Sequence, residues 1–154
     1  MRKIGHFAVI AALLAPTMSA ANEIYARNPG SIVAALQDLG YRASLDTDSE
    51  GDPMIRSAVE GVDYVIFFYG CTDNLNCEYI QFSAGFNVPD VLTAVQMNDW
   101  NRRKLVGEAT VDEEGDPWLS FFITTDGGLT RDNFADAVDW WELSVRDFKE
   151  FIDW

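Results

Sequence analysis

The longest stretch of helical periodicity lies at the end of the chain, where apolar residues recur at alternating steps of four and three. This stripe consists of Phe134, Val138, Trp141, Val145, Phe148 and Ile152. Such spacing is typical of a helix that buries one side. Thr130 stands just before the stripe and is a favourable N-cap residue, so the pattern predicts a helix from Thr130 to about Ile152.

Shorter patterns predict the remaining elements. Segments of alternating or continuous apolar character, separated by turn residues, indicate strands at 41–45, 54–59, 62–69, 79–86, 104–111 and 118–125. Apolar residues three and four apart indicate further helices at 31–39 and 90–103, the second with Pro89 as its first helical residue. The order α-β-β-β-β-α-β-β-α predicts one mixed α+β domain on an antiparallel sheet.

Two predicted hairpins share an acidic turn that ends in Glu-Gly-Asp-Pro. The first copy is 50–53 and the second is 114–117. The segment Asp46-Thr-Asp48-Ser-Glu50-Gly51-Asp52 resembles the start of a calcium-binding loop, but Ser57 occupies the twelfth position, where such loops need an acidic ligand. A repeated hairpin turn explains both copies, and a calcium-dependent module remains the alternative.

The amino terminus has the pattern of a secretory signal peptide. Basic residues begin the chain, an apolar run follows at 7–15, and small residues precede a cleavage point before Asn22. The apolar run is too short to span a bilayer. We therefore expect residues 1–21 to be a cleaved signal, residues 22–154 to form one domain, and the protein to be periplasmic or secreted, with no membrane insertion after cleavage.

The net charge, and the expected lack of histidine in the mature protein, narrow the possible functions. The chain has 11 Lys and Arg residues against 25 Asp and Glu residues, a net charge of −14. Such an acidic chain repels phosphate backbones, which disfavours nucleic-acid binding. The expected cleavage would remove His6, the single histidine, and with it catalysis that depends on a histidine base. We expect no enzymatic activity, no catalytic residue, no metal and no cofactor.

The two cysteines flank a polar loop, Cys71-Thr-Asp-Asn-Leu-Asn-Cys77, between two predicted strands. A redox site would favour the Cys-x-x-Cys spacing, and two thiolates are too few for a zinc site. In an oxidising compartment the spacing favours a disulfide between Cys71 and Cys77 across the mouth of a hairpin.

Exposed aromatic residues give the candidate binding surface. Helices on one side of the predicted sheet would leave aromatic residues of the strand 62–69 facing water, so either a chain end folds over them or another molecule covers them. A basic cluster ends the helix at 90–103, where it could neutralise the helix dipole or contact an acidic partner. The candidate partner-binding residues are Trp100, Trp118, Trp140 and Trp141, with Arg102, Arg103 and Lys104 at the rim.

Several short motifs together resemble those of the YbjN-domain family. They are Asn28-Pro, Ser49-Glu-Gly-Asp-Pro53, Phe68-Tyr-Gly-Cys-Thr-Asp73, Gln81-Phe-Ser-Ala-Gly-Phe86, Asn98-Asp-Trp-Asn101 and Glu113-Glu-Gly-Asp-Pro117. The resemblance implies a bacterial sensory-transduction regulator with a fold like that of type III secretion chaperones, and it brings no catalytic or ligand residues.

These observations lead to one expected function and its alternatives. We expect a non-enzymatic, exported regulatory or chaperone-like module that binds a protein partner or a second copy of itself, as in a homodimer. The alternatives are a module that binds calcium or a small ligand and, less favoured, an enzyme based on carboxylates.

Overall fold

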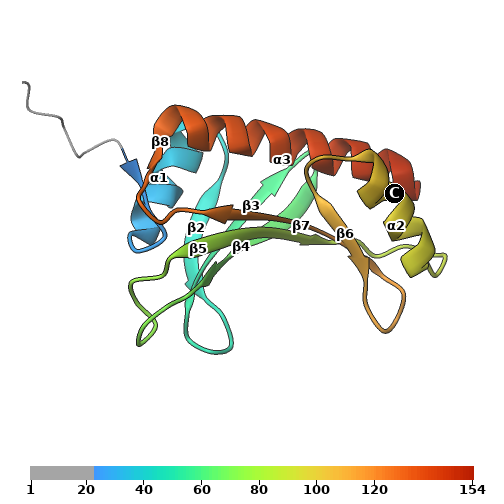
Figure 1. Ribbon diagram of the computed structural model, residues 1–154, viewed down its shortest axis with the longest axis horizontal. Helices are drawn as coiled ribbons and strands as arrows, with labels where there is room; N and C mark the ends of the chain where they lie inside the picture. Colours follow the sequence, from blue (N-terminus) through green and yellow to red (C-terminus); the bar gives the residue numbers. More distant parts are fainter. Residues whose placement is uncertain (1–22) are drawn as a thin grey trace, which may run out of the picture.

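The structure, a computed structural model, describes residues 23–154 (Figure 1). Within them six strands form one antiparallel sheet in the order β2-β3-β4-β5-β7-β6. These strands are β2 (Ala43–Thr47), β3 (Pro53–Val59), β4 (Val62–Tyr69), β5 (Tyr79–Gly85), β6 (Glu108–Val111) and β7 (Pro117–Thr124). The helices are α1 (Pro29–Asp38), α2 (Ala94–Arg103) and α3 (Arg131–Ile152). The predicted α+β class and antiparallel sheet are confirmed.

Helix α3 lies along one face of the sheet, and its predicted apolar stripe packs against the strands (Figure 1). Thr130 caps the helix as predicted, since its hydroxyl accepts a hydrogen bond from the N–H of Asn133 at 3.1 Å. The buried core includes Ile55, Tyr64, Ile66, Phe68, Ile80, Phe82 and Leu119 from the sheet and Phe134, Val138, Trp141, Val145 and Phe148 from α3. Because side chains alternate along a strand, the opposite face of the sheet carries the other half of each strand's residues.

Ion pairs connect both ends of α3 to the other helices. Near its first turn, Arg131 pairs with Asp38 of α1 at 2.5 Å. Towards its other end, Asp147 pairs with Lys104, which caps α2, at 2.8 Å. A two-stranded sheet of β1 (Glu23–Ile24) and β8 (Leu129–Thr130), which the sequence pattern did not predict, joins the first described residues to the start of α3.

The start of α2 corrects the sequence prediction. The helix begins at Ala94 rather than near Pro89, because Thr93 and Gln96 form a capping box in which each side chain serves the other residue's backbone N–H. The apolar spacing that predicted this helix included Val91, Leu92 and Val95, but it does not mark the buried side, since Val91 and Val95 are exposed. The buried residues of α2 are Met97 and Trp100.

The two acidic turns adopt the same conformation. In the first, the Asp48 carboxylate accepts hydrogen bonds from the N–H groups of Glu50 and Asp52, both at 2.9 Å. In the second, Asp112 accepts from Glu114 at 3.1 Å and from Asp116 at 2.9 Å. These contacts favour the repeated-turn interpretation, because one oxygen of each aspartate is already engaged by the backbone. Residues 23–154 contain no group of three or more acidic, histidine or cysteine residues placed to hold a metal ion.

The predicted disulfide joins Cys71 and Cys77 at the mouth of the β4–β5 hairpin. Beside it, the N–H of Glu78 donates to the carbonyl of Tyr69 at 2.9 Å. The bridge therefore closes a small covalent ring next to Tyr69 and Tyr79, the last pair of the β4–β5 ladder. The expected signal peptide at 1–21 lies outside the described residues. Within the part that is described, no helix has both the length and the apolarity to cross a bilayer.

Candidate functional site

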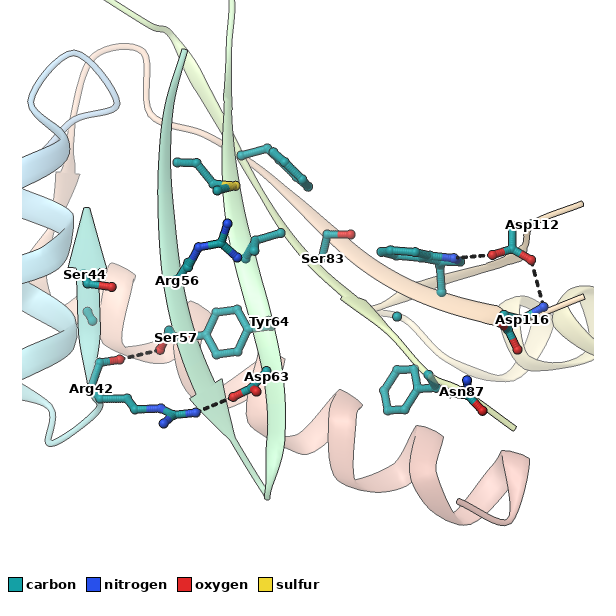
Figure 2. A pocket seen from close by; sticks show the side chains of 17 residues that line it. Arg42, Ser44, Arg56, Ser57, Asp63, Tyr64, Ser83, Asn87, Asp112 and Asp116 are labelled. Carbon is teal, nitrogen blue, oxygen red and sulfur yellow. Dashed lines mark hydrogen bonds and ion pairs between the residues drawn. The ribbon is translucent and has the colours of Figure 1, made fainter. Parts of the chain in front are cut away.

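The face of the sheet opposite α3, which we call the open face, contains a groove. The cavity has a volume of about 890 Å³ and extends from β2 and β3 across β4 and β5 to β7. Figure 2 shows Arg42 and Asp63 towards one end, Asp112 and Asp116 towards the other, and Ser83 between them. Met54, Val65 and Phe67 contribute its apolar lining.

Register explains why these residues lie together. Met54 of β3 pairs with Phe67 of β4, and Arg56 pairs with Val65. Val65 in turn pairs with Ser83 of β5. Residues that pair directly across antiparallel strands point to the same face. Strands β3, β4 and β5 therefore form the middle of the groove, and turn residues such as Asp112 and Asp116 lie at its end.

Trp118 forms one end of the groove by lying flat against Gly85. The two residues are register partners on β7 and β5. A methyl group at position 85 would come within 2.9 Å of the indole carbons, so the missing side chain is what lets the ring lie against the strand. Trp118 remains 40% exposed. It therefore offers an aromatic surface to a ligand in the groove.

An acidic turn holds this indole in place. The Trp118 N–H donates to the second carboxylate oxygen of Asp112 at 3.0 Å. This hydrogen bond, together with those from the N–H groups of the turn, holds the pKa of Asp112 below its usual value. Asp112 thus stays ionised, and one carboxylate organises both the turn and the aromatic ring.

The opposite end carries two arginines whose charges are already compensated. Arg42 forms an ion pair with Asp63. Arg56 forms one with Asp46 at 2.8 Å, and this contact, with the Thr47 N–H, lowers the pKa of the Asp46 carboxyl. At the Trp118 end, by contrast, Asp116 makes no ion pair with another described residue. The uncompensated charge of the groove is therefore negative and lies beside the aromatic ring.

Two of the predicted partner-binding tryptophans lie in the core. Trp100 is 1% exposed, and its indole N–H donates to the carbonyl of Gly107 at 2.6 Å. Trp141 is fully buried and packs against Tyr64 and Phe82. Neither side chain is available to a partner at the surface, so both are removed from the candidate set. For Trp141 the reason is its place in the apolar stripe of α3.

The other candidates occupy separate places. Trp118 lines the groove, whereas Trp140 is exposed on α3, the helix that covers the opposite face. Arg102 and Arg103 both pair with Asp99 of their own helix. With Lys104 already paired to α3, the whole basic cluster is engaged locally. The predicted residues therefore do not form one surface.

The groove residues that sequence reasoning missed are Met54, Arg42 and Arg56. Met54 and Arg56 lie on β3 and Arg42 just before β2, in segments whose alternation was recognised, but the position of Met54 beside Phe67 depends on the register between β3 and β4. The turn that sets the pairing of β3 with β4 is Glu60–Gly61, between the paired residues Val59 and Val62.

The fold and the groove define an α+β domain with a ligand-sized site on the uncovered face of its sheet. Residues 28–154 match the model of the YbjN family, described as "Putative bacterial sensory transduction regulator", and the chain belongs to this family. Neither a curated protein nor a solved structure gives a significant match. The likeness to type III secretion chaperones therefore stays an expectation from the resemblance.

Proposed function

We propose that this protein is an exported, non-enzymatic module of sensory transduction that binds a segment of a partner protein in the groove of its open face. The observation that carries the proposal is the groove itself, which has Met54, Val65 and Phe67 in its lining and ends at an exposed tryptophan. Uncovered aromatic surface of this kind is typical of contact sites. The family's description as a regulator agrees with binding rather than catalysis.

Charge supports an occupant with basic as well as apolar side chains. The two arginines of the groove are neutralised by Asp63 and Asp46, while the unpaired Asp116 lies at the Trp118 end. A lysine or arginine stacked on the indole would gain a cation–π contact and the attraction of that carboxylate. The net charge of −14 would also speed the approach of a basic partner.

Export is supported by two features that are independent of each other. The disulfide is stable in oxidising compartments, and the amino-terminal pattern is that of a secretory signal. Intact mass measurement of the protein isolated from an exporting host tests this part. A chain that begins at Asn22 and is two hydrogen atoms lighter than its reduced form is expected; an uncleaved, reduced chain would contradict export.

Site-specific photo-cross-linking in the exporting host tests the binding surface. A photoreactive residue at Ser83 in the groove is expected to cross-link a protein of defined mass, and Trp118→Ala should abolish this product. The matched control is the same photoreactive residue at Asp136, which is exposed on α3. Equal cross-linking from both positions, or no effect of Trp118→Ala, would refute the groove as the site.

A second candidate function is the binding of a small molecule, and the size of the cavity favours it. A volume of about 890 Å³ lies within the range of small-ligand sites. Native mass spectrometry of the isolated protein distinguishes the two functions. An adduct below about 1 kDa that disappears in Trp118→Ala would support a small ligand, whereas the absence of adducts together with a Ser83 cross-link would support the protein partner.

A further inference from the structure

The two edge strands of the sheet differ in how their backbone groups are satisfied. At β6 the side chain of Asn101 closes the edge, because its amide donates to the carbonyl of Ala109 at 3.0 Å and accepts from the Ala109 N–H at 2.8 Å. The Asn101 amide occupies the backbone groups that an added strand would use, so it blocks the addition of another strand at this edge. The β2 edge has no equivalent cover among the described residues.

The hairpin turn determines which groups of β2 point outwards. The N–H of Asp48 donates to the carbonyl of Asp52 at 2.9 Å, and hydrogen-bonded pairs alternate along an antiparallel ladder. Residues 46 and 44 therefore bond to β3, and residues 43, 45 and 47 direct their N–H and C=O groups away from the sheet. Two hydrogen bonds agree with this alternation. The Ser57 hydroxyl of β3 donates to the carbonyl of Arg42, and the Gln37 amide of α1 donates to the carbonyl of Ala43.

Side chains satisfy two of the six outward groups. The Gln37 amide donates to the Ala43 carbonyl at 3.0 Å, and the Thr47 N–H donates to the Asp46 carboxylate at 2.9 Å. No hydrogen bond within the described residues engages the other four. They are the Ala43 N–H, both groups of Leu45, and the Thr47 carbonyl.

The four free groups of one β2 strand are complementary to the same four groups of a second copy of the chain. In an antiparallel pairing of two β2 strands about a twofold axis at Leu45, each Leu45 would exchange both of its hydrogen bonds with Leu45 of the other copy. Each free Ala43 N–H would face the free Thr47 carbonyl of the other strand. The two groups that side chains already satisfy, the Ala43 carbonyl and the Thr47 N–H, would also face each other.

We propose that the β2 edge is an interface between two copies of this chain, paired antiparallel and centred on Leu45. Four hydrogen bonds would form between the strands without displacing a bond that exists within either copy. The Leu45 side chain, 55% exposed in the single chain, would lie opposite its counterpart. The two sheets would become one continuous sheet, and this conclusion does not depend on what binds in the groove.

Cysteine cross-linking tests the register directly. In the proposed pairing the two Cα atoms at position 45 lie about 5.5 Å apart, within the range of a disulfide. Ala43→Cys and Thr47→Cys are matched controls, since each pairs with the other position and like positions are separated by about 13 Å. Residues 23–154 hold no free cysteine, so each variant adds the sole reactive thiol of this region.

Under mild oxidation Leu45→Cys is expected to give a covalent dimer, and each control is expected to give at most a tenth as much. Mixing Ala43→Cys with Thr47→Cys is expected to restore the dimer, since these positions face each other. Equal cross-linking at all three positions, or none at Leu45→Cys, would overturn the proposed register.

Sedimentation velocity tests the interface without a new covalent bond. The measurement is made at about 0.5 M salt, where repulsion between two acidic chains is screened. Wild-type protein is expected to show a concentration-dependent dimer that Leu45→Pro shifts to monomer, because proline removes an N–H that β3 does not use. If Leu45→Pro lowers the melting temperature, Leu45→Lys replaces it as the variant that should shift the dimer to monomer. Leu105→Lys is the matched control, because Leu105 is 94% exposed and lies away from β2. A wild-type monomer at all concentrations, or a dimer indifferent to Leu45, would refute the interface.

Discussion

The packing of Trp118 on Gly85 predicts that Gly85→Ala destabilises the wild-type protein but stabilises a variant that lacks the Trp118 indole. Gly85→Ala would place a methyl group 2.9 Å from the indole, a distance at which one of the two must move. The Gly85 backbone is not in the left-handed region, so the added methyl group is the main source of strain. Overpacking of this kind costs about 1–3 kcal/mol. In a Trp118→Ala background the same change should instead stabilise by roughly 0.5–1 kcal/mol, because glycine weakens a strand.

Urea denaturation of the wild type, both single variants and the double variant measures this coupling. The expected coupling free energy is about 1.5–4 kcal/mol, the difference between the two effects of Gly85→Ala. Gly30→Ala is the control, because its added methyl group meets no atom closer than 3.5 Å. In the Gly85→Ala protein, displacement of the indole should also raise the pKa of Asp112 towards its usual value, which a carbon NMR titration detects. Equal effects of Gly85→Ala in both backgrounds would refute the packing argument.

Three further predictions concern other features. Replacing Cys71 and Cys77 by serine should lower the free energy of unfolding by about 2 kcal/mol in urea, since the ring they close is small; an unchanged value would show that the bridge does not constrain the unfolded chain. Burial raises the pKa of Tyr64 to about 12 from 10.0, so stability conferred by its neutral hydroxyl is complete below pH 10 and is lost as pH rises towards 12. Tyr64→Phe should therefore flatten the loss of stability over that window, and parallel curves would contradict this. Asn101→Ala should cost about 1–2 kcal/mol by removing two hydrogen bonds from the β6 edge, while Asn98→Ala on the same helix should have little effect in the same thermal or urea assay.

Sequence patterns predicted the parts of the fold that depend on local chemistry. The start of α3 at its threonine cap, the strand Val62–Tyr69 and the disulfide all follow from residues close in the chain. The start of α2 was wrong because two local signals compete, Pro89 and the capping box at Thr93, and the capping box determines the first turn.

The candidate site was predicted only in part, because burial depends on contacts between distant segments. Trp118 was predicted as a partner-binding residue, and the strand 62–69, which carries Phe67, was predicted to expose aromatic residues on an uncovered face. Trp100 was placed at the surface because no local pattern shows that its indole reaches Gly107 and packs on Phe148. Register, which brings Arg56 of β3 to the same face as Phe67, likewise depends on how the strands pair with one another.

Helix α3 follows all six strands of the main sheet in the chain, which has a consequence for biosynthesis. A ribosome therefore makes the whole sheet before residues 134–152, whose apolar side packs on it. Until these residues emerge, Phe82 lacks the contact with Trp141 that it makes in the folded domain. A nascent chain therefore exposes part of the apolar face of its sheet until α3 has been made. A premature stop codon before Trp141 should accordingly yield a chain that aggregates rather than a shorter folded domain.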